Sequence, residues 1–201
     1  VTHFAESVTI RVGAAGTSAG WWGIQRVRLE TAVSHPSPPA PPSAPGVWTS
    51  PVYEDWWPGA TGWNGSSLAV STCAQFGTML GGYGSLGHSD YVEKTFTNLP
   101  LHSSLRLQLT FTRIDRLDTG LIYVDGAEAW RHAFGLYGGV GAQHVCGAPD
   151  DNNYYMDDQV TADVTVTHFA ENVTIRVGAS GTSAGWWGIQ CVRLETAVSH
   201  P

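Results

Sequence analysis

Charged residues are scarce in this chain of 201 residues, and basic residues are the scarcest. Lys and Arg number 10 against 17 Asp and Glu, which gives a formal net charge of -7 and a pI near 5.5. A protein that binds a phosphate backbone needs clustered Lys and Arg, so this balance excludes nucleic acid as a partner. With only 13% charged residues, the surface must be covered by Ser, Thr, Asn and Gly, which is typical of extracellular proteins.

Long apolar runs and catalytic signatures are also missing. No stretch approaches the about 20 apolar residues needed to cross a bilayer, so we expect no membrane span. The sequence starts at Val1 without Met or a charged-then-apolar signal pattern, and we expect a mature or excised segment. It contains no HExxH, no GxSxG and no P-loop lysine, so we expect neither a catalytic site nor a required cofactor.

The strongest positive signal is an internal repeat. Residues 1–36 return as residues 166–201 with three differences: Ser7 corresponds to Asn172, Ala15 to Ser180 and Arg26 to Cys191. The repeat divides the chain into a terminal block at 1–36, a spacer at 37–46 and a domain at 47–201. In this division the first block is the tail of a preceding unit.

The pattern inside each block favours two strands. Val8, Ile10 and Val12 alternate with Thr9 and Arg11, which is the period of a half-buried strand. The segment WWGIQRVRLET alternates in the same way after a Gly/Ser turn, so we expect each block to form a β-hairpin or two closing strands. Two strands alone are marginal in water, so the first block needs a partner to cover its apolar face.

Two explanations of the first block stay open. It can be donated to the sandwich of an adjacent protomer, or abut it, and repetition of this head-to-tail contact would give a filament. It can also result from a cut through a tandem array. The interface candidates under the first explanation are Val8, Ile10, Val12, Trp21, Trp22 and Cys191.

The spacer is proline-rich and predicts an extended, semi-rigid connection at about 3.1 Å per residue. Its mixture of Ser, Pro and Ala is the composition of O-glycosylated stalks. The candidates for O-glycosylation or hydroxylation are Ser37, Pro38, Pro39, Pro41, Pro42 and Ser43. The alternative is a plain spacer or a docking ligand for an aromatic groove.

The body of the chain, from Val47 on, consists of short strand-like runs bounded by Gly, Pro, Asn or Asp, without sustained helical periodicity. In LRLQLTF, Leu105, Leu107, Leu109 and Phe111 fall on one face and polar residues on the other. This alternation indicates a sheet with one solvated side. We therefore predict an all-β fold, a β-sandwich or jelly-roll-like domain with a Pro-rich spacer and an N-terminal β-hairpin-like block.

Two modifications are predicted from short motifs. N-glycosylation sequons occur at Asn64 and Asn172, the first in a Gly-rich loop and the second on the outward side of its strand. Among the three cysteines, we favour a disulfide between Cys73 and Cys146 over the other two pairings, since it closes a long loop worth about 4 kcal/mol. Cys191 is then a free thiol or an intermolecular link.

Acidic loops offer oxygen ligands for a structural calcium ion at Asp115, Asp118, Asp157 and Asp158, although no EF-hand spacing is present. Solvated loop carboxylates are the plainer interpretation. A paired-carboxylate glycosidase would have to use the same aspartates across an open cleft, which we do not expect. The nine tryptophans can form sugar-stacking platforms or, more commonly, anchor a core or an interface.

Residues 71–130 resemble a module of large cell-surface proteins of protists and algae. The shared motifs are an STC start, an LGGYG turn, a KTFTNLP strand, an ID-x-x-D loop, a YVDG turn, the downstream Cys146-Gly147 and a closing WGI strand at 187–189. With a Pro-rich spacer, the arrangement is similar to flagellar-hair (mastigoneme-like) and glycocalyx filament proteins. The resemblance implies a structural, heavily glycosylated polymer and also favours the Cys73–Cys146 pair.

Two functions follow as hypotheses. The first is a structural subunit of an extracellular glycosylated filament, whose partners are copies of itself and whose glycans are covalently attached. The alternative is a carbohydrate-binding or adhesive module that uses exposed aromatics and a calcium-bearing loop around Asp118 and Asp157. Both place the chain outside the cell or on its surface.

Overall fold

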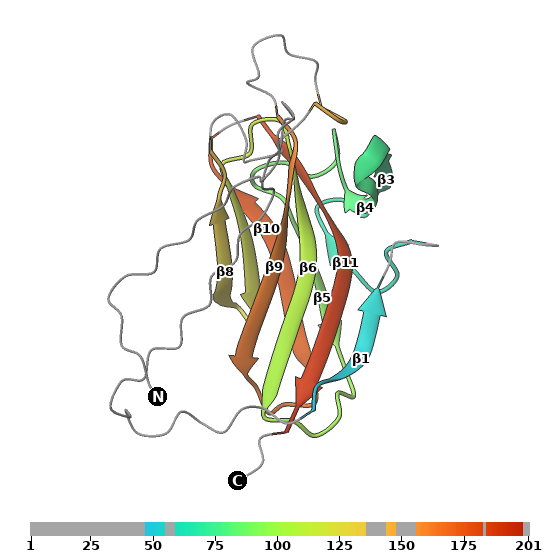
Figure 1. The fold of residues 1–201 in the computed structure, drawn as a ribbon, viewed down its shortest axis with the longest axis vertical. Helices are drawn as coiled ribbons and strands as arrows, with labels where there is room; N and C mark the ends of the chain where they lie inside the picture. Colours follow the sequence, from blue (N-terminus) through green and yellow to red (C-terminus); the bar gives the residue numbers. More distant parts are fainter. Residues whose placement is uncertain (1–46, 55–58, 136–143, 148–155, 183, 199–201) are drawn as a thin grey trace, which may run out of the picture. The chain divides into compact units, whose positions relative to one another are not determined.

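We analysed a computed structural model of the chain, which describes residues 47–54, 59–135, 144–147, 156–182 and 184–198 (Figure 1). The first block, the spacer and their candidate residues lie outside this part, so the predictions made for them remain predictions. The described residues contain no helix long and apolar enough to span a membrane. They belong to one compact unit, Ala40–Pro201.

Two antiparallel sheets form the domain. The six-stranded sheet has the order β3-β4-β11-β6-β9, and β1 also pairs with β11. Its strands are β1 (Thr49–Glu54), β3 (Val70–Cys73), β4 (Gly77–Gly81), β6 (Ser104–Ile114), β9 (Asp158–Thr167) and β11 (Trp186–Ala197). The five-stranded sheet has the order β2-β5-β10-β7-β8. Its strands are β2 (Asn64–Gly65), β5 (Tyr91–Phe96), β7 (Thr119–Val124), β8 (Ala127–Ala133) and β10 (Val173–Ser180).

A short 3-10 turn, η1 (Ala74–Phe76), is the one helical element among the described residues. The long strands run along the domain in two layers (Figure 1). The predicted all-β sandwich is therefore confirmed.

The core lies between the two sheets and is built by alternating side chains. Leu105, Leu107, Leu109 and Phe111 of β6 are each at most 1% exposed, as their spacing in the sequence predicted. From the opposite layer, the apolar residues of β10 join the same hydrophobic cluster. Trp187 of β11 stacks on Phe111 with ring centroids 5.4 Å apart and donates its indole N–H to the Gly87 carbonyl at 2.8 Å.

The second copy of the repeat does not form a hairpin. Its two strands lie in different sheets, where β10 pairs with β5 and β7, and β11 pairs with β6, β4 and β1. The hairpin expectation is wrong for this copy, and the expectation of two closing strands is correct. Both strands turn their apolar residues toward one core, so they must lie on opposite sides of it rather than next to each other.

The side chains that correspond to the interface candidates of the first block form part of this core. Val173, Ile175 and Val177 repeat Val8, Ile10 and Val12, and all three are at most 1% exposed. Trp187, which repeats Trp22, is fully buried. In the described copy, these positions stabilise the domain itself and do not form a surface.

Cys191 occupies a bulge in β11. Its φ of 51° lies in the left-handed region, and the pairing with β6 changes register between Gln190 and Arg193. On the other side of β11, the partner changes from β4, which pairs with Ile189, to β1, which pairs with Val192. The Cys191 thiol is exposed and has no disulfide partner among the described residues of its own chain, so a free thiol and an intermolecular link both remain predictions.

Candidate functional site

A cleft of about 690 Å³ opens on the outer face of the five-stranded sheet. We call it the cleft. Its wall and floor come from three neighbouring strands, β5, β10 and β7, and from the turn between β7 and β8. Its lining includes Tyr91, Glu93, Tyr123, Asp125, Thr174 and Arg176.

Strand periodicity places these side chains on one face. In β5, Val92 and Phe96 point into the core, so Tyr91 and Glu93 point outward. The strand register brings three of these side chains together: Arg176 of β10 lies opposite Glu93 of β5 on one side and opposite Tyr123 of β7 on the other. The cleft thus has an arginine at its centre, with an acid and a phenol as direct neighbours.

Arg176 is held by two contacts. Its Nε and Nη2 atoms both donate to Glu93 Oε2 at 2.8 Å, and its guanidinium carbon lies 4.3 Å from the centre of the Tyr91 ring. The hydrogen bond to Glu93 raises the pKa of the Arg176 guanidinium above its usual value. The group therefore stays charged and oriented while about half of its surface remains open to a ligand.

Asp125 closes one end of the cleft from a two-residue turn. Asp125 and Gly126 both have positive φ, which matches the type I′ hairpin turn that an Asp-Gly pair favours. Asp125 Oδ1 accepts the Thr174 N–H at 2.8 Å, and its backbone N–H donates to the Thr174 carbonyl at 2.9 Å. The turn is therefore tied to the start of β10.

A chain of two hydrogen-bonded histidines with nearly parallel rings lies behind Asp125. His168 Nε2 is 3.1 Å from Asp125 Oδ2, His168 Nδ1 is 2.7 Å from His102 Nε2, and His102 Nδ1 is 2.6 Å from the Pro100 carbonyl. The Pro100 carbonyl and the Asp125 carboxylate are the acceptors at the two ends of this chain. Both rings are buried, and they fix the position of the Asp125 carboxylate.

The chemistry of the cleft suits a sugar. Tyr91 and Tyr123 offer aromatic surface against which the C–H groups of a pyranose pack. Arg176 donates hydrogen bonds, and Glu93 and Asp125 accept them, so hydroxyls find partners of both kinds. The volume lies within the range of about 300–1,000 Å³ that is usual for small-ligand sites.

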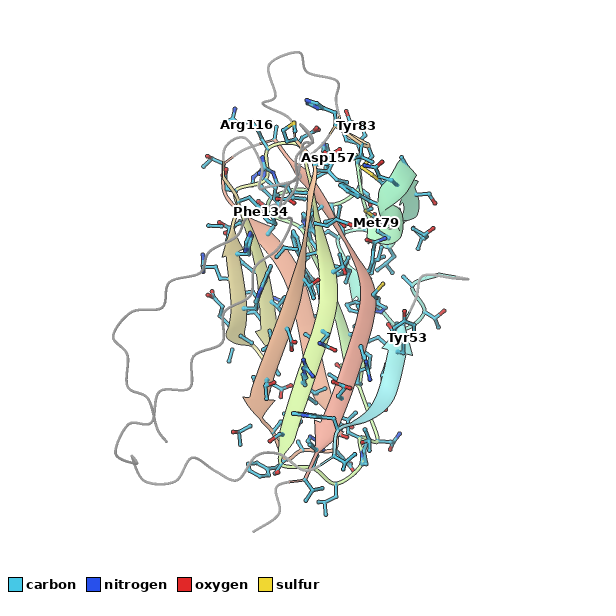
Figure 2. All side chains as sticks on the ribbon, viewed as in Figure 1. Tyr53, Met79, Tyr83, Arg116, Phe134 and Asp157 are labelled. Atoms are coloured by element: carbon cyan, nitrogen blue, oxygen red, sulfur yellow. A yellow bond between two sulfur atoms is a disulfide. The ribbon has the colours of Figure 1, made fainter. Side chains whose placement is uncertain are left out.

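Two of the acidic residues predicted as a calcium site, Asp157 and Asp118, accept hydrogen bonds from backbone N–H groups. Asp157 is fully buried, and its oxygens accept the backbone N–H groups of Asp115, Val145, Cys146 and Gly147 at 2.7 to 3.3 Å. It lies at the end of the sandwich where β9 begins (Figure 2). No group of three or more His, Cys, Asp or Glu is placed to hold a metal ion in the part of the chain described.

Calcium binding remains a prediction for Asp115, Asp118, Asp157 and Asp158. Asp118 accepts the Thr182 N–H at 2.8 Å through Oδ2. Asp115 and Asp157 are at most 2% exposed and joined by a hydrogen bond, so they do not face each other across the open cleft that the glycosidase alternative requires. That alternative has no geometric support at these aspartates.

The predicted disulfide joins Cys73, at the end of β3, to Cys146 with Cα atoms 5.2 Å apart. The pairing is confirmed. Both sequon asparagines are exposed, so the described structure leaves room for a glycan at Asn64 and at Asn172.

The aromatic surface of the cleft comes from tyrosines, Tyr91 and Tyr123. Trp63 and Trp187 are buried, and none of the tryptophans in the described ranges lines the cleft. The sequence analysis did not single out Tyr91 or Tyr123. The alternation in YVEKTF places Tyr91 on the outward face of its strand, but the sequence alone does not tell which strands lie next to that strand.

No protein-family model and no curated protein matches the chain. Several solved β-rich domains are similar at low identity. The CBM36-1 domain of a multidomain xylanase from the hindgut metagenome of Trinervitermes trinervoides has 11% identity and a TM-score of 0.43, with 74% of this chain and 98% of that chain covered.

The K3 cleaved adhesin domain of Lys-gingipain from Porphyromonas gingivalis W83 has 11% identity and a TM-score of 0.46, covering 74% of this chain and 99% of that chain. A family 35 carbohydrate-binding module from Clostridium thermocellum has 15% identity and a TM-score of 0.36, covering 71% and 98%. These scores are too low to carry an argument about function, which rests below on the cleft.

Proposed function

We propose that the domain is an extracellular carbohydrate-binding module and that the cleft is its binding site. The observation that carries the proposal is the grouping of Tyr91, Tyr123, Arg176 and Glu93 on one open sheet face. Aromatic surface next to fixed, charged hydrogen-bonding groups is the combination that recognises a polyhydroxylated ring. The Cys73–Cys146 disulfide supports an oxidising, extracellular location.

The cleft is prepared for binding before a ligand arrives. Arg176 is already oriented by Glu93 and Tyr91, and Asp125 by the histidine chain, so little side-chain entropy is lost when a sugar binds. The open shape admits an internal segment of a polysaccharide as well as a chain end. Because the site is solvated, we expect weak affinity, with Kd values of about 1 mM to 1 μM.

We expect Tyr91→Ala and Arg176→Ala to reduce carbohydrate binding at least about tenfold, which corresponds to about 1.4 kcal/mol. The measurement uses the full chain produced in a bacterial periplasm, where disulfides form, and labelled oligosaccharides of xylan, mannan and β-glucan type. Tyr83→Ala is the matched control, since Tyr83 is 51% exposed but lies outside the cleft. Absence of binding to all probes, or equal binding by all four proteins, would contradict the proposal.

A second candidate function is the filament subunit of a glycosylated cell-surface polymer. The observation in its favour is that the three differences between the repeats fall at positions that are not buried, Asn172, Ser180 and Cys191. Every buried side chain of β10 and β11 therefore has an identical counterpart in the first block. Residues 1–36 of one chain have the sequence required to complete the sandwich of another.

One physical objection limits this candidate. Each domain has one place for β10 and one for β11, and residues 166–201 already supply both. A donated block must therefore displace strands that are identical to it at every buried position, which gains no core contacts and loses the entropy of association. Donation therefore drives assembly only where the chain's own β10 and β11 are weakened or absent. Substitution of Ile175 in β10 and of its counterpart Ile10 in the first block tests this condition.

A further inference from the structure

Both sequon asparagines lie on the sheet face that carries the cleft. Asn64 is the register partner of Glu93, and register partners point to the same side of a sheet. Trp63, the preceding residue, points into the core and is 3% exposed. Asn172 precedes the buried Val173 and therefore also faces outward.

The two asparagines differ in their distance from the centre of the cleft. The Cβ atoms of a directly opposed pair are about 5 Å apart, so Asn64 lies next to Glu93, which binds Arg176. Asn172 is four residues before Arg176 on β10, about 13 Å along the strand at about 3.3 Å per residue. A glycan on Asn64 begins at the wall of the cleft, and one on Asn172 begins beyond its end.

The Asn64 sequon is fastened to the cleft strand. The Ser66 backbone N–H donates to the Tyr91 carbonyl at 2.9 Å, and the Tyr91 N–H donates to Ser66 Oγ at 3.2 Å. Both contacts lie two residue pairs away from the Asn64–Glu93 pair, directly after the Gly65–Val92 pair. The attachment point of the glycan is therefore held at a constant, short distance from Tyr91 and Arg176.

We infer that the N-linked glycan on Asn64 occupies the cleft of its own chain, so the ligand class of the site is an N-glycan-type oligosaccharide. This inference rests on the proposed carbohydrate-binding function. A short tether holds its ligand at an effective concentration of about 1 mM. A sugar that binds with a Kd in the micromolar to millimolar range is then bound for much of the time, and free sugars must displace it.

The experiment measures the binding of a free probe, the fluorescently labelled N-glycan core pentasaccharide. The full chain is secreted from a host that attaches N-glycans, and glycopeptide mass spectrometry establishes which asparagines are modified. Wild type, Asn64→Gln and Asn172→Gln are compared. We expect Asn64→Gln to bind the probe at least about twofold more tightly than wild type, and about tenfold more tightly for a Kd of about 0.1 mM, because the tethered competitor is gone.

Asn172→Gln is the matched control, since it removes a glycan from the same face but not from the wall of the cleft, and we expect it to bind as wild type does. Adding Tyr91→Ala to Asn64→Gln should abolish the gain. Equal binding of the probe by Asn64→Gln and wild type overturns the inference, and so does an unmodified Asn64 in the secreted chain. In either case the proposed function still stands if the protein binds xylan, mannan or β-glucan probes. A failure of Asn64→Gln to bind any oligosaccharide overturns both.

Discussion

A chain that carries Ile175→Asp should fold only with the help of residues 1–36. Ile175 is fully buried at the middle of the five-stranded sheet, paired with Lys94 on one side and Val124 on the other. An aspartate there places a carboxyl group among buried apolar side chains, and the neighbouring cation, Lys94, already pairs with Glu54. We expect a loss of more than about 4 kcal/mol. Residues 166–201 then no longer complete the sandwich. Their copy at 1–36 keeps isoleucine at the corresponding position, so we expect it to take the places of β10 and β11.

The comparison needs three variants and one thermal or urea unfolding measurement. Ile175→Asp should keep a cooperative unfolding transition, Ile10→Asp should unfold as wild type does, and the double variant should show no transition. Ile10 is the counterpart of Ile175 in the first block, so the same substitution is matched in chemistry and sequence context. If Ile175→Asp is as unfolded as the double variant, the first block cannot replace β10 and β11.

Light scattering on the Ile175→Asp variant shows whether residues 1–36 complete the sandwich of another chain, as the filament hypothesis requires, or that of their own chain. Completion of one chain by the block of another gives masses that are multiples of 21.5 kDa. A folded species at 21.5 kDa shows that the block returned to its own domain, which argues against head-to-tail linkage. Regular fibres in electron micrographs of this variant are the expected result under the filament hypothesis.

Local periodicity was sufficient to predict the fold class and the core-facing residues. The alternation from Leu105 to Phe111 and from Val173 to Val177 depends only on the period of a strand, and each predicted inward residue is buried. The same period does not reveal which strand is the neighbour. The hairpin expectation failed for this reason, since two strands joined by a short turn can pair with each other or cross the core.

The cleft could not be predicted for a related reason. It depends on the register between β5 and β10, which sets Glu93 opposite Arg176 over a separation of 83 residues. The sequence identified the outward face of the repeated strand but not its partner strands. It left sugar stacking by tryptophans open and favoured anchoring in a core or an interface, as Trp63 and Trp187 show. The aspartates chosen for calcium were found by composition alone, and the burial of Asp157 was not visible in the sequence.

Removing the Asp157 carboxylate should destabilise the domain by about 3–5 kcal/mol, because a buried group with several partners is lost at once. Its two oxygens accept four backbone N–H groups, of Asp115 after β6 and of residues 145–147 around the disulfide. Asp157→Ala leaves the buried Asp115 donor and the three half-buried donors of residues 145–147 without their carboxylate acceptor. Asp157→Asn should lose less, since its amide oxygen still accepts the bonds of residues 145–147 while its NH₂ group faces the Asp115 donor.

Urea unfolding of the disulfide-intact protein measures these losses. Asp163→Ala is the control, because Asp163 is partly exposed and pairs with Arg106 on the outer face of the six-stranded sheet, where such a pair is worth about 0.2–1 kcal/mol. The hydrogen bond from Arg106 lowers the pKa of Asp163, so its small contribution is present at neutral pH and lost as the pH falls through that lowered pKa. An Asp157→Ala loss no larger than the Asp163→Ala loss would mean that residues 144–147 are held by the Cys73–Cys146 disulfide alone, and that the buried carboxylate is free for another role, including the calcium site predicted from the sequence.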